Sequence, residues 1–182
     1  MTFKLFPYLL IFVISLSCKS HVYVEEKKLT FNKVEIPLDI TPISEIEEQL
    51  GTNYETFNWN TFSTEHIYKR KGISFTYKQE DSIRRMVNWI NVETSRNTIN
   101  LEDRVTINKR TTVGEVVEQF ENSSWDYDST YSGLIIEYPY FDIIVRLTQK
   151  DKELLRKETS FEDEEKFFQL FKEHKIKGIE VF

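Results

Sequence analysis

The sequence predicts an α+β fold in which tandem β-α-β-β repeats form a mainly antiparallel sheet with helices on one face, followed by a C-terminal helix and a short strand. Three observations predict this fold. Several short runs alternate apolar and polar residues, as strands with one buried face do. Two segments have the apolar spacing of short helices and align with each other without a gap. With 5 Gly and 4 Pro in 182 residues, the chain has the composition of a globular domain, and a fibrous or disordered chain is excluded.

The first residues have the pattern of a signal peptide. A short basic head over residues 1–4 precedes an apolar run over residues 5–16, and small or polar residues follow. A membrane-spanning helix needs about 20 apolar residues, so this run is too short to cross a bilayer. Residues 1–17 are therefore predicted to be a leader that directs export.

The end of the leader, residues 15–18 (SLSC), resembles the lipobox of bacterial lipoproteins, with Ser15 where that family usually has Leu. The resemblance implies cleavage before Cys18, acylation of Cys18 with palmitate-like chains, and a membrane anchor at that residue. Cys18 is the single cysteine, so it has no intramolecular disulfide partner. Lys19 replaces the Asp that retains enteric lipoproteins at the inner membrane, which favours the outer membrane; simple secretion or an uncleaved anchor is the alternative.

Four segments are expected in the chain. They are the signal peptide over residues 1–17, a lipidated tether over 18–32, a first repeat over 33–101, and a second repeat with the C-terminal helix and strand over 102–182. The formal net charge is −6, and loss of Lys4 with the leader makes it one unit more negative. Nucleic acid is therefore not an expected partner. The expected partners are the membrane, through the lipid on Cys18, and another protein of the cell envelope.

The first repeat begins with an alternating run over residues 33–39, which predicts a half-buried strand. Thr41 and Pro42 then suit the start of a helix, and Gly51 suits its end. Residues 72–77 and 85–93 are rich in β-branched and aromatic side chains and predict two further strands.

The same order of elements recurs in the second half. Residues 41–50 align on residues 111–120 with coinciding apolar positions, and residues 72–77 align on residues 133–138. Strands are also expected over residues 104–108 and 140–148. The pattern indicates an internal repeat; two unrelated amphipathic helices, each followed by a hairpin, are the alternative.

The C-terminal part predicts a helix that begins at Ser160, with Asp163 three residues later as a cap-like partner. Phe161, Phe168 and Phe171 follow at helical spacing and are typical of a core-facing stripe. A final strand is expected over residues 178–182.

One pattern in the chain consists of a short helix that ends in Leu50 and Gly51, a connection, Gly72 and Ile73 with Tyr77, and then an apolar strand. It resembles an uncharacterised bacterial domain often found in lipoproteins. The pattern is more loosely similar to the helix-plus-hairpin modules of outer-membrane assembly lipoproteins and of the β-lactamase inhibitor protein. The resemblance covers residues 33–148 and implies a fold and a tendency to bind proteins. It carries over no catalytic residue.

The pattern of reactive side chains predicts no enzyme, no cofactor and no metal site. The 3 histidines stand apart from one another, and no cysteine remains as a nucleophile once Cys18 is acylated. Asp126 and Asp128 lack the further oxygen ligands of a calcium loop, and a plain turn is the simpler interpretation. Carboxylate pairs on the two predicted helices, at residues 45 and 48 and at 115 and 118, suit a solvated face better than glycoside hydrolysis.

Aromatic side chains in the connecting segments are the candidate partner-binding residues. They are Trp59, Phe62, Trp125, Tyr127 and Tyr131. If the repeat is real, the two segments are expected to form one concave aromatic surface; packing of the same residues under a loop is the alternative. The leading hypothesis is a membrane-anchored, non-enzymatic binding module of the envelope, such as an assembly factor or an immunity-type inhibitor. A hydrolase of peptidoglycan or another envelope glycan competes with it, and a purely structural lipoprotein is a third possibility.

Overall fold

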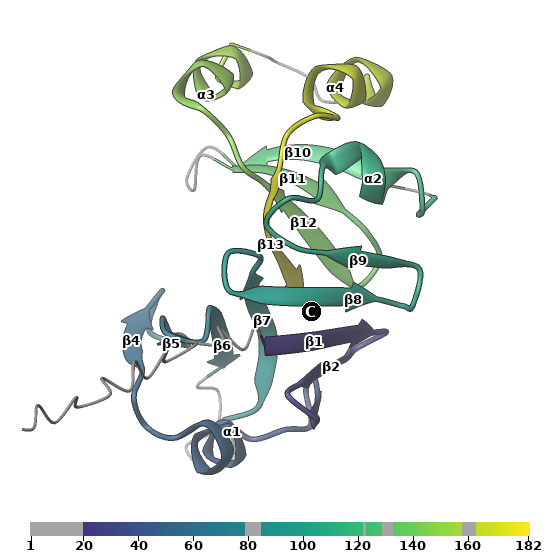
Figure 1. Ribbon diagram of the computed structural model, residues 1–182. Helices are drawn as coiled ribbons and strands as arrows, with labels where there is room; N and C mark the ends of the chain where they lie inside the picture. The colour runs from purple at the N-terminus through teal and green to yellow at the C-terminus, as the bar shows by residue number, and fades with distance from the viewer. Residues whose placement is uncertain (1–19, 79–84, 122, 129–132, 158–162) are drawn as a thin grey trace, which may run out of the picture.

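The computed structural model describes residues 20–78, 85–121, 123–128, 133–157 and 163–182 (Figure 1). Within these residues the protein is α+β, with mostly antiparallel sheets and four helices, so the predicted fold class is confirmed at this level. The predicted leader, Cys18 and Tyr131 lie outside the described residues. In the described part of the chain, no helix has the length and apolar character needed to cross a membrane.

One sheet has five strands. In sheet order they are β3 (Val34–Pro37), β2 (Lys28–Phe31), β1 (Ser20–Glu25), β8 (Asn97–Leu101) and β9 (Val105–Ile107). β1 is the central strand, antiparallel to β2 and parallel to β8. The tether predicted over residues 18–32 is therefore wrong for β1 and β2, because their apolar side chains, such as Val22 and Leu29, are fully buried. The boundary expected between residues 101 and 102 falls in the turn between the paired strands β8 and β9.

The other sheet has eight strands. In sheet order they are β10 (Ser124–Asp128), β11 (Gly133–Glu137), β12 (Phe141–Val145), β13 (Ile176–Val181), β7 (Val87–Glu93), β6 (Ile73–Lys78), β5 (Ser63–Tyr68) and β4 (Glu55–Asn58). Every neighbouring pair is antiparallel. Two groups of four strands, β4–β7 and β10–β13, meet where β13 pairs with β7, so β4 and β10 are the two edges of the sheet.

Four helices accompany the sheets, and their ends follow local chemistry. They are α1 (Ile43–Leu50), α2 (Val113–Val117), α3 (Gln149–Leu155) and α4 (Glu164–Phe171). Gly51 ends α1 with a φ of 83°, a left-handed conformation that glycine adopts without strain. Asp163 caps α4 by accepting a hydrogen bond from the Lys166 backbone N–H, whereas Ser160 lies outside the described residues. α3 was not predicted; a capping box of Thr148 and Asp151 begins it.

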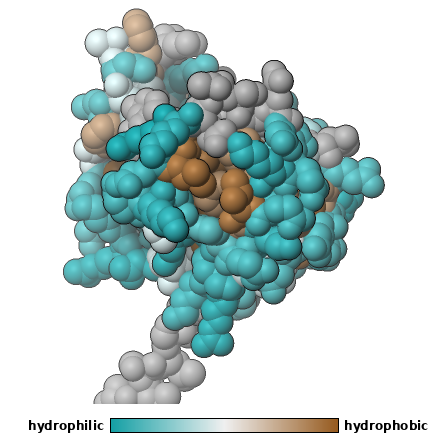
Figure 2. All heavy atoms as spheres, turned by 90° about the horizontal axis from the view of Figure 1, so that it is seen from above, coloured by the Kyte–Doolittle hydropathy of each residue, from teal (hydrophilic) through white to brown (hydrophobic). Residues whose placement is uncertain are grey.

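The core lies between the inner faces of the two sheets and under the helices. Phe31 and Ile99 of the five-stranded sheet and Phe75 and Ile143 of the eight-stranded sheet are among its fully buried side chains. α3 and α4 lie together at one end of the molecule (Figure 1), and the surface on that side is largely polar with an apolar area near its centre (Figure 2). The core occupies one face of the eight-stranded sheet. Alternate side chains of its strands lie on the other face, here called the outward face.

Candidate binding face

The outward face carries a row of polar side chains at one level across six adjacent strands. Side chains directly opposite each other on neighbouring strands share a face of the sheet. From β10 to β6 the register aligns Ser124, Glu137, Asp142, Glu180, Asn91 and Ser74. None of the six is basic. Glu137, Asp142 and Glu180, here called the acidic row, place three carboxyl groups opposite one another on β11, β12 and β13.

Two members of the acidic row have hydrogen-bond donors beside them. The Ser124 hydroxyl donates to Glu137 Oε2 at 2.7 Å, and the Asn91 amide donates to Glu180 Oε1 at 2.9 Å. Burial raises the pKa of Glu180, and the Asn91 hydrogen bond opposes that shift. Because like charges directly opposite on adjacent strands are destabilising, these polar neighbours reduce the cost of the row without removing it.

Asp142 is the most buried residue of the acidic row. Its side chain is 7% exposed, and its Oδ1 atom has no hydrogen-bond partner within the described part of the chain. Burial raises the pKa of Asp142 to about 7, and the negative charges of Glu137 and Glu180 add to the shift, while a hydrogen bond from the Tyr138 backbone opposes it. A buried acceptor without a donor costs about 1–3 kcal/mol, so a native fold rarely leaves one without a role.

A cavity of about 480 Å³ opens beside Asp142. Its lining comes from β7, β10, β11 and β12, the turn after β11, and the last residue of the chain: Trp89, Ser124, Glu137, Tyr138, Pro139, Asp142 and Phe182. The Trp89 and Phe182 rings lie 5.3 Å apart between centroids, and Trp89 is 38% exposed. The cavity thus combines aromatic walls with carboxylates, and its size is in the range of small-molecule and side-chain binding sites.

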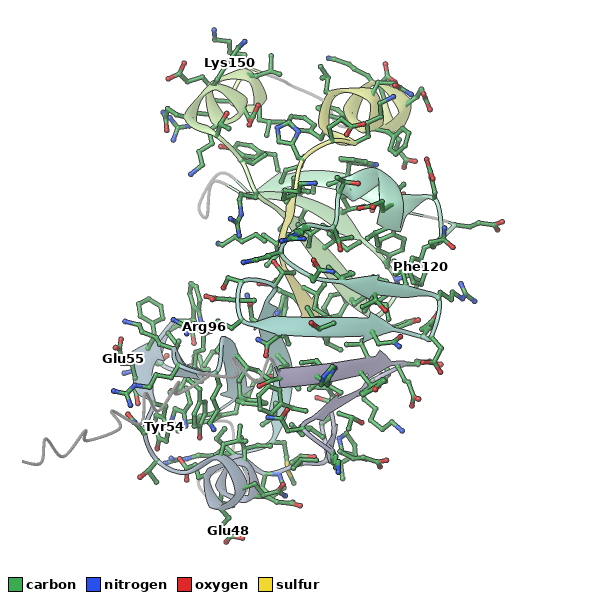
Figure 3. All side chains as sticks on the ribbon, viewed as in Figure 1. Glu48, Tyr54, Glu55, Arg96, Phe120 and Lys150 are labelled. Carbon is green, nitrogen blue, oxygen red and sulfur yellow. The ribbon has the colours of Figure 1, made fainter. Side chains whose placement is uncertain are left out.

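A second polar cluster lies on the inner face, where α1 meets β5 and β6. Tyr54, in the segment that leaves α1 (Figure 3), donates to Glu47 at 2.6 Å and stacks on His66 at 3.9 Å between ring centroids. His66 Nδ1 lies 3.3 Å from Glu47, and its Nε2 lies 3.2 Å from the Tyr77 hydroxyl. Burial lowers the pKa of His66, which favours the neutral ring. This cluster fastens α1 to the sheet and is a packing element of the core.

The structure separates the aromatic residues that the sequence grouped. Trp59 and Phe62 lie in the turn between β4 and β5 and are 42% and 64% exposed, and Trp59 Nε1 donates to Glu65 at 3.1 Å. Trp125 and Tyr127 lie in β10 at the opposite edge of the sheet. Trp125 is 5% exposed and stacks on Phe167 of α4, while Tyr127 is half-buried against the core. The four described residues of the predicted set therefore do not form a single concave surface, and Tyr131 lies outside the described residues.

Other side chains that the sequence analysis considered as site residues make contacts near the ends of helices. Glu115 belongs to the capping box of α2, and the backbone N–H of Thr112 lowers its pKa. His174 Nε2 lies 3.1 Å from Asp151, next to the start of α3. Among the described residues, no group of three His, Cys, Asp or Glu side chains is placed to hold a metal ion.

No protein-family model, curated protein or solved structure matches this chain. The chemistry of the outward face is then the basis for a functional proposal, because a fold by itself does not determine function.

Sequence reasoning missed Trp89 and the acidic row. A signal was present: Asp142 and Glu180 are single acidic residues inside apolar runs, FDIIV and GIEVF, where they take the outward positions of the strands. The sequence does not show that these runs are neighbours, so it does not show that their carboxyl groups meet.

Alanine variants of Trp125 and Trp59, which lie at opposite edges of the sheet, distinguish a buried tryptophan from an exposed one. We expect Trp125→Ala to lower the free energy of unfolding by about 3–5 kcal/mol, because it empties a buried site against Phe167. Trp59→Ala, the matched control at the exposed edge, should change it by less than about 0.5 kcal/mol. Urea unfolding of both variants measures the difference. Equal midpoints for the two variants would contradict the placement of Trp125 in the core.

Removing the charge of Asp142 should stabilise the protein at neutral and alkaline pH. The pKa of Asp142 is about 7 in the folded protein, against 3.8 as the ordinary value. The stability that this raised pKa contributes is complete below the ordinary value and is lost as the pH rises through 7. We therefore expect Asp142→Asn to gain about 2 kcal/mol near pH 8 and almost nothing near pH 3.

The control for this comparison is Glu118→Gln, which removes an exposed carboxylate outside the acidic row. Urea unfolding of both variants at the two pH values is the measurement. The negative charges of Glu137, Glu180 and Asp126 all raise the pKa of Asp142. A gain in stability for Asp142→Asn that does not depend on pH would show that the ionised Asp142 carboxyl group does not destabilise the fold.

Proposed function

We propose that this protein is a lipid-anchored, non-enzymatic binding module of the bacterial envelope that holds a cationic segment of another protein on its outward face. The observation that carries the proposal is Asp142, a buried carboxyl group with an unpartnered oxygen between two further carboxyl groups. A positively charged partner would supply the missing donor and offset the repulsion within the acidic row.

The charge of the outward face extends beyond the acidic row. Glu65 of β5 accepts hydrogen bonds from Ser74 and Trp59, and its negative charge helps to raise the pKa of Glu180. Exposed aromatic side chains, Phe57 and Trp59, lie 4.7 Å apart between ring centroids at the β4 edge. Such a mixture of acidic and aromatic side chains suits an extended basic peptide segment, because aromatic residues supply contact area and carboxylates supply specificity.

The start of β1 supports an anchor close to the domain. β1 begins at Ser20, two residues after Cys18, and two extended residues span about 7 Å. A lipid on Cys18 would therefore hold the domain directly at the membrane surface, and we propose the outer membrane as its location. Ser20 lies opposite Asn97, whose side-chain amide donates to the carbonyl oxygens of Lys71 and Gly72. The exposed side chain of Arg96 packs beside Gly72, so positive charge lies near the proposed anchor, where it suits anionic headgroups.

We also propose that the two halves of the chain are copies of one unit. Ile43 and Ile46 of α1 and the aligned Val113 and Val116 of α2 are all buried. The order of the eight-stranded sheet is symmetric about the β7–β13 pair, which gives each helix four following strands instead of two. By position in the sheet, however, β6 corresponds to β12, whereas the sequence alignment matched residues 72–77 with 133–138, which form β11. The unit we propose is therefore a helix followed by four antiparallel strands, with α3 and α4 inserted between β12 and β13 in the second copy.

A glycan hydrolase is the second candidate, and one observation favours it. Asp142, with its pKa near 7, lines a cavity together with Glu137 and an exposed tryptophan. Glycoside hydrolases use a carboxylic acid with a raised pKa and a second carboxylate.

The binding proposal predicts selective capture from cell envelopes. Crosslinking followed by purification should recover one protein in near-stoichiometric amount, and recovery should fall at high salt. The variant Glu137→Gln/Glu180→Gln should lose the protein, because it removes two charges of the acidic row. The variant Glu48→Gln/Glu118→Gln removes two exposed charges, one on α1 and one at the C-terminal end of α2, and should retain it. Equal recovery by both variants would contradict a partner on the outward face.

The hydrolase candidate predicts turnover of a glycan. Purified peptidoglycan and other envelope glycans incubated with the protein should remain intact if the face only binds. Release of soluble fragments that stops in Asp142→Asn, with Glu118→Gln unaffected, would replace the binding proposal with the hydrolase.

A further inference from the structure

We propose that the cavity beside Asp142 binds the guanidinium group of an arginine side chain. The inference rests on the proposed function and names the group of the partner that enters the outward face. In this cavity a buried carboxyl group, a second carboxylate and the rings of Trp89 and Phe182 converge.

The unmet requirement of the cavity is a hydrogen-bond donor with positive charge. Asp142 Oδ1 is an acceptor without a partner, and Asp142 is more than nine-tenths buried. Glu137 lies directly opposite Asp142 and lines the same cavity. Among the described residues that line the cavity, none is basic. A cation from outside would therefore satisfy the acceptor and reduce the repulsion between the two carboxyl groups at once.

The residue types that line the cavity favour a planar cation over a metal ion. The described residues offer no group of three ligands for a metal. A guanidinium group presents a fork of donors that matches a carboxylate, and its flat face stacks on aromatic rings. Trp89 and Phe182 provide such rings, at an interplanar angle of 41°, on the side of the cavity formed by β7 and the end of the chain. An ammonium group would form the ion pair without the stacking or the fork.

The position of the cavity in the sheet also suits a side chain that arrives from a bound segment. Asp142 and Glu137 lie on β12 and β11, next to the edge strand β10, and Trp89 lies on β7 in the middle of the sheet. Ser124, Glu137 and Asp142 of the polar row line the cavity, so an extended segment that crosses the strands at this level would pass it.

The test uses three small probes with the purified protein: N-acetylarginine methylamide, N-acetyllysine methylamide, and the neutral isostere N-acetylcitrulline methylamide. The NMR signal of the Trp89 indole N–H is followed during titration. We expect the arginine probe to bind about tenfold more tightly than the lysine probe, and the citrulline probe not to shift the signal, because it lacks the charge. Asp142→Asn should abolish arginine binding, whereas Glu118→Gln should leave it unchanged.

The outcomes separate this inference from the proposed function. Equal binding of the arginine and citrulline probes, or arginine binding that survives in Asp142→Asn, would overturn the guanidinium site. Because Asp142→Asn is expected to be at least as stable as the wild type, loss of binding in that variant would not be a folding defect. If a protein is captured on the outward face but the arginine probe does not bind, the guanidinium site is wrong and the binding module stands. Arginine binding without any captured protein would keep the site and contradict the module.

Discussion

The antiparallel pairing of β13 with β7 is the interaction on which the rest of the structure depends. It joins two four-stranded groups into one sheet and sets Val181 opposite Ile90 and Ile179 opposite Val92. Gly178 permits the close approach, since a Cβ atom at that position would lie 2.6 Å from the Val92 carbonyl oxygen. The same register places Glu180 between Asn91 and Asp142. A shift of one residue would turn Glu180 into the core and break the polar row.

The acidic row is a feature that folding alone does not favour. Three carboxyl groups face one another across adjacent strands, and the middle group is buried with an unpartnered oxygen. Natural proteins accept such local costs where a site needs them, and stability and function then oppose each other. The inner cluster around His66 differs, because it is packed between α1 and the sheet. His66 Nδ1 also lacks a hydrogen bond, but it lies 3.3 Å from Glu47, whereas Asp142 lines a cavity. This contrast is why the outward face, and not the histidine, is the candidate site.

Local pattern was sufficient for part of the fold. The alternation in residues 33–39 predicted β3, and the spacing of Ile43, Ile46 and Gly51 predicted α1. β1 was missed although Val22 and Val24 alternate with polar neighbours, because the surrounding charged residues resemble a linker. Its parallel partner β8 is also far away in the chain. The candidate site was not predictable for the same reason. Each acidic residue is visible in its own strand, but only the registers of β11, β12 and β13 bring the three together.

The most direct test of the account is the titration of the Asp142 carboxyl group, followed by its carbon chemical shift in NMR from acid to mildly alkaline pH. We expect an apparent pKa near 7, raised by burial and by Glu137 and Glu180, and a lower pKa in Glu180→Gln, where one of the neighbouring negative charges is removed. A pKa at the ordinary value for aspartate, unchanged in that variant, would show that the carboxyl group is solvated and paired, and would contradict the central claim that the outward face holds a strained acidic site.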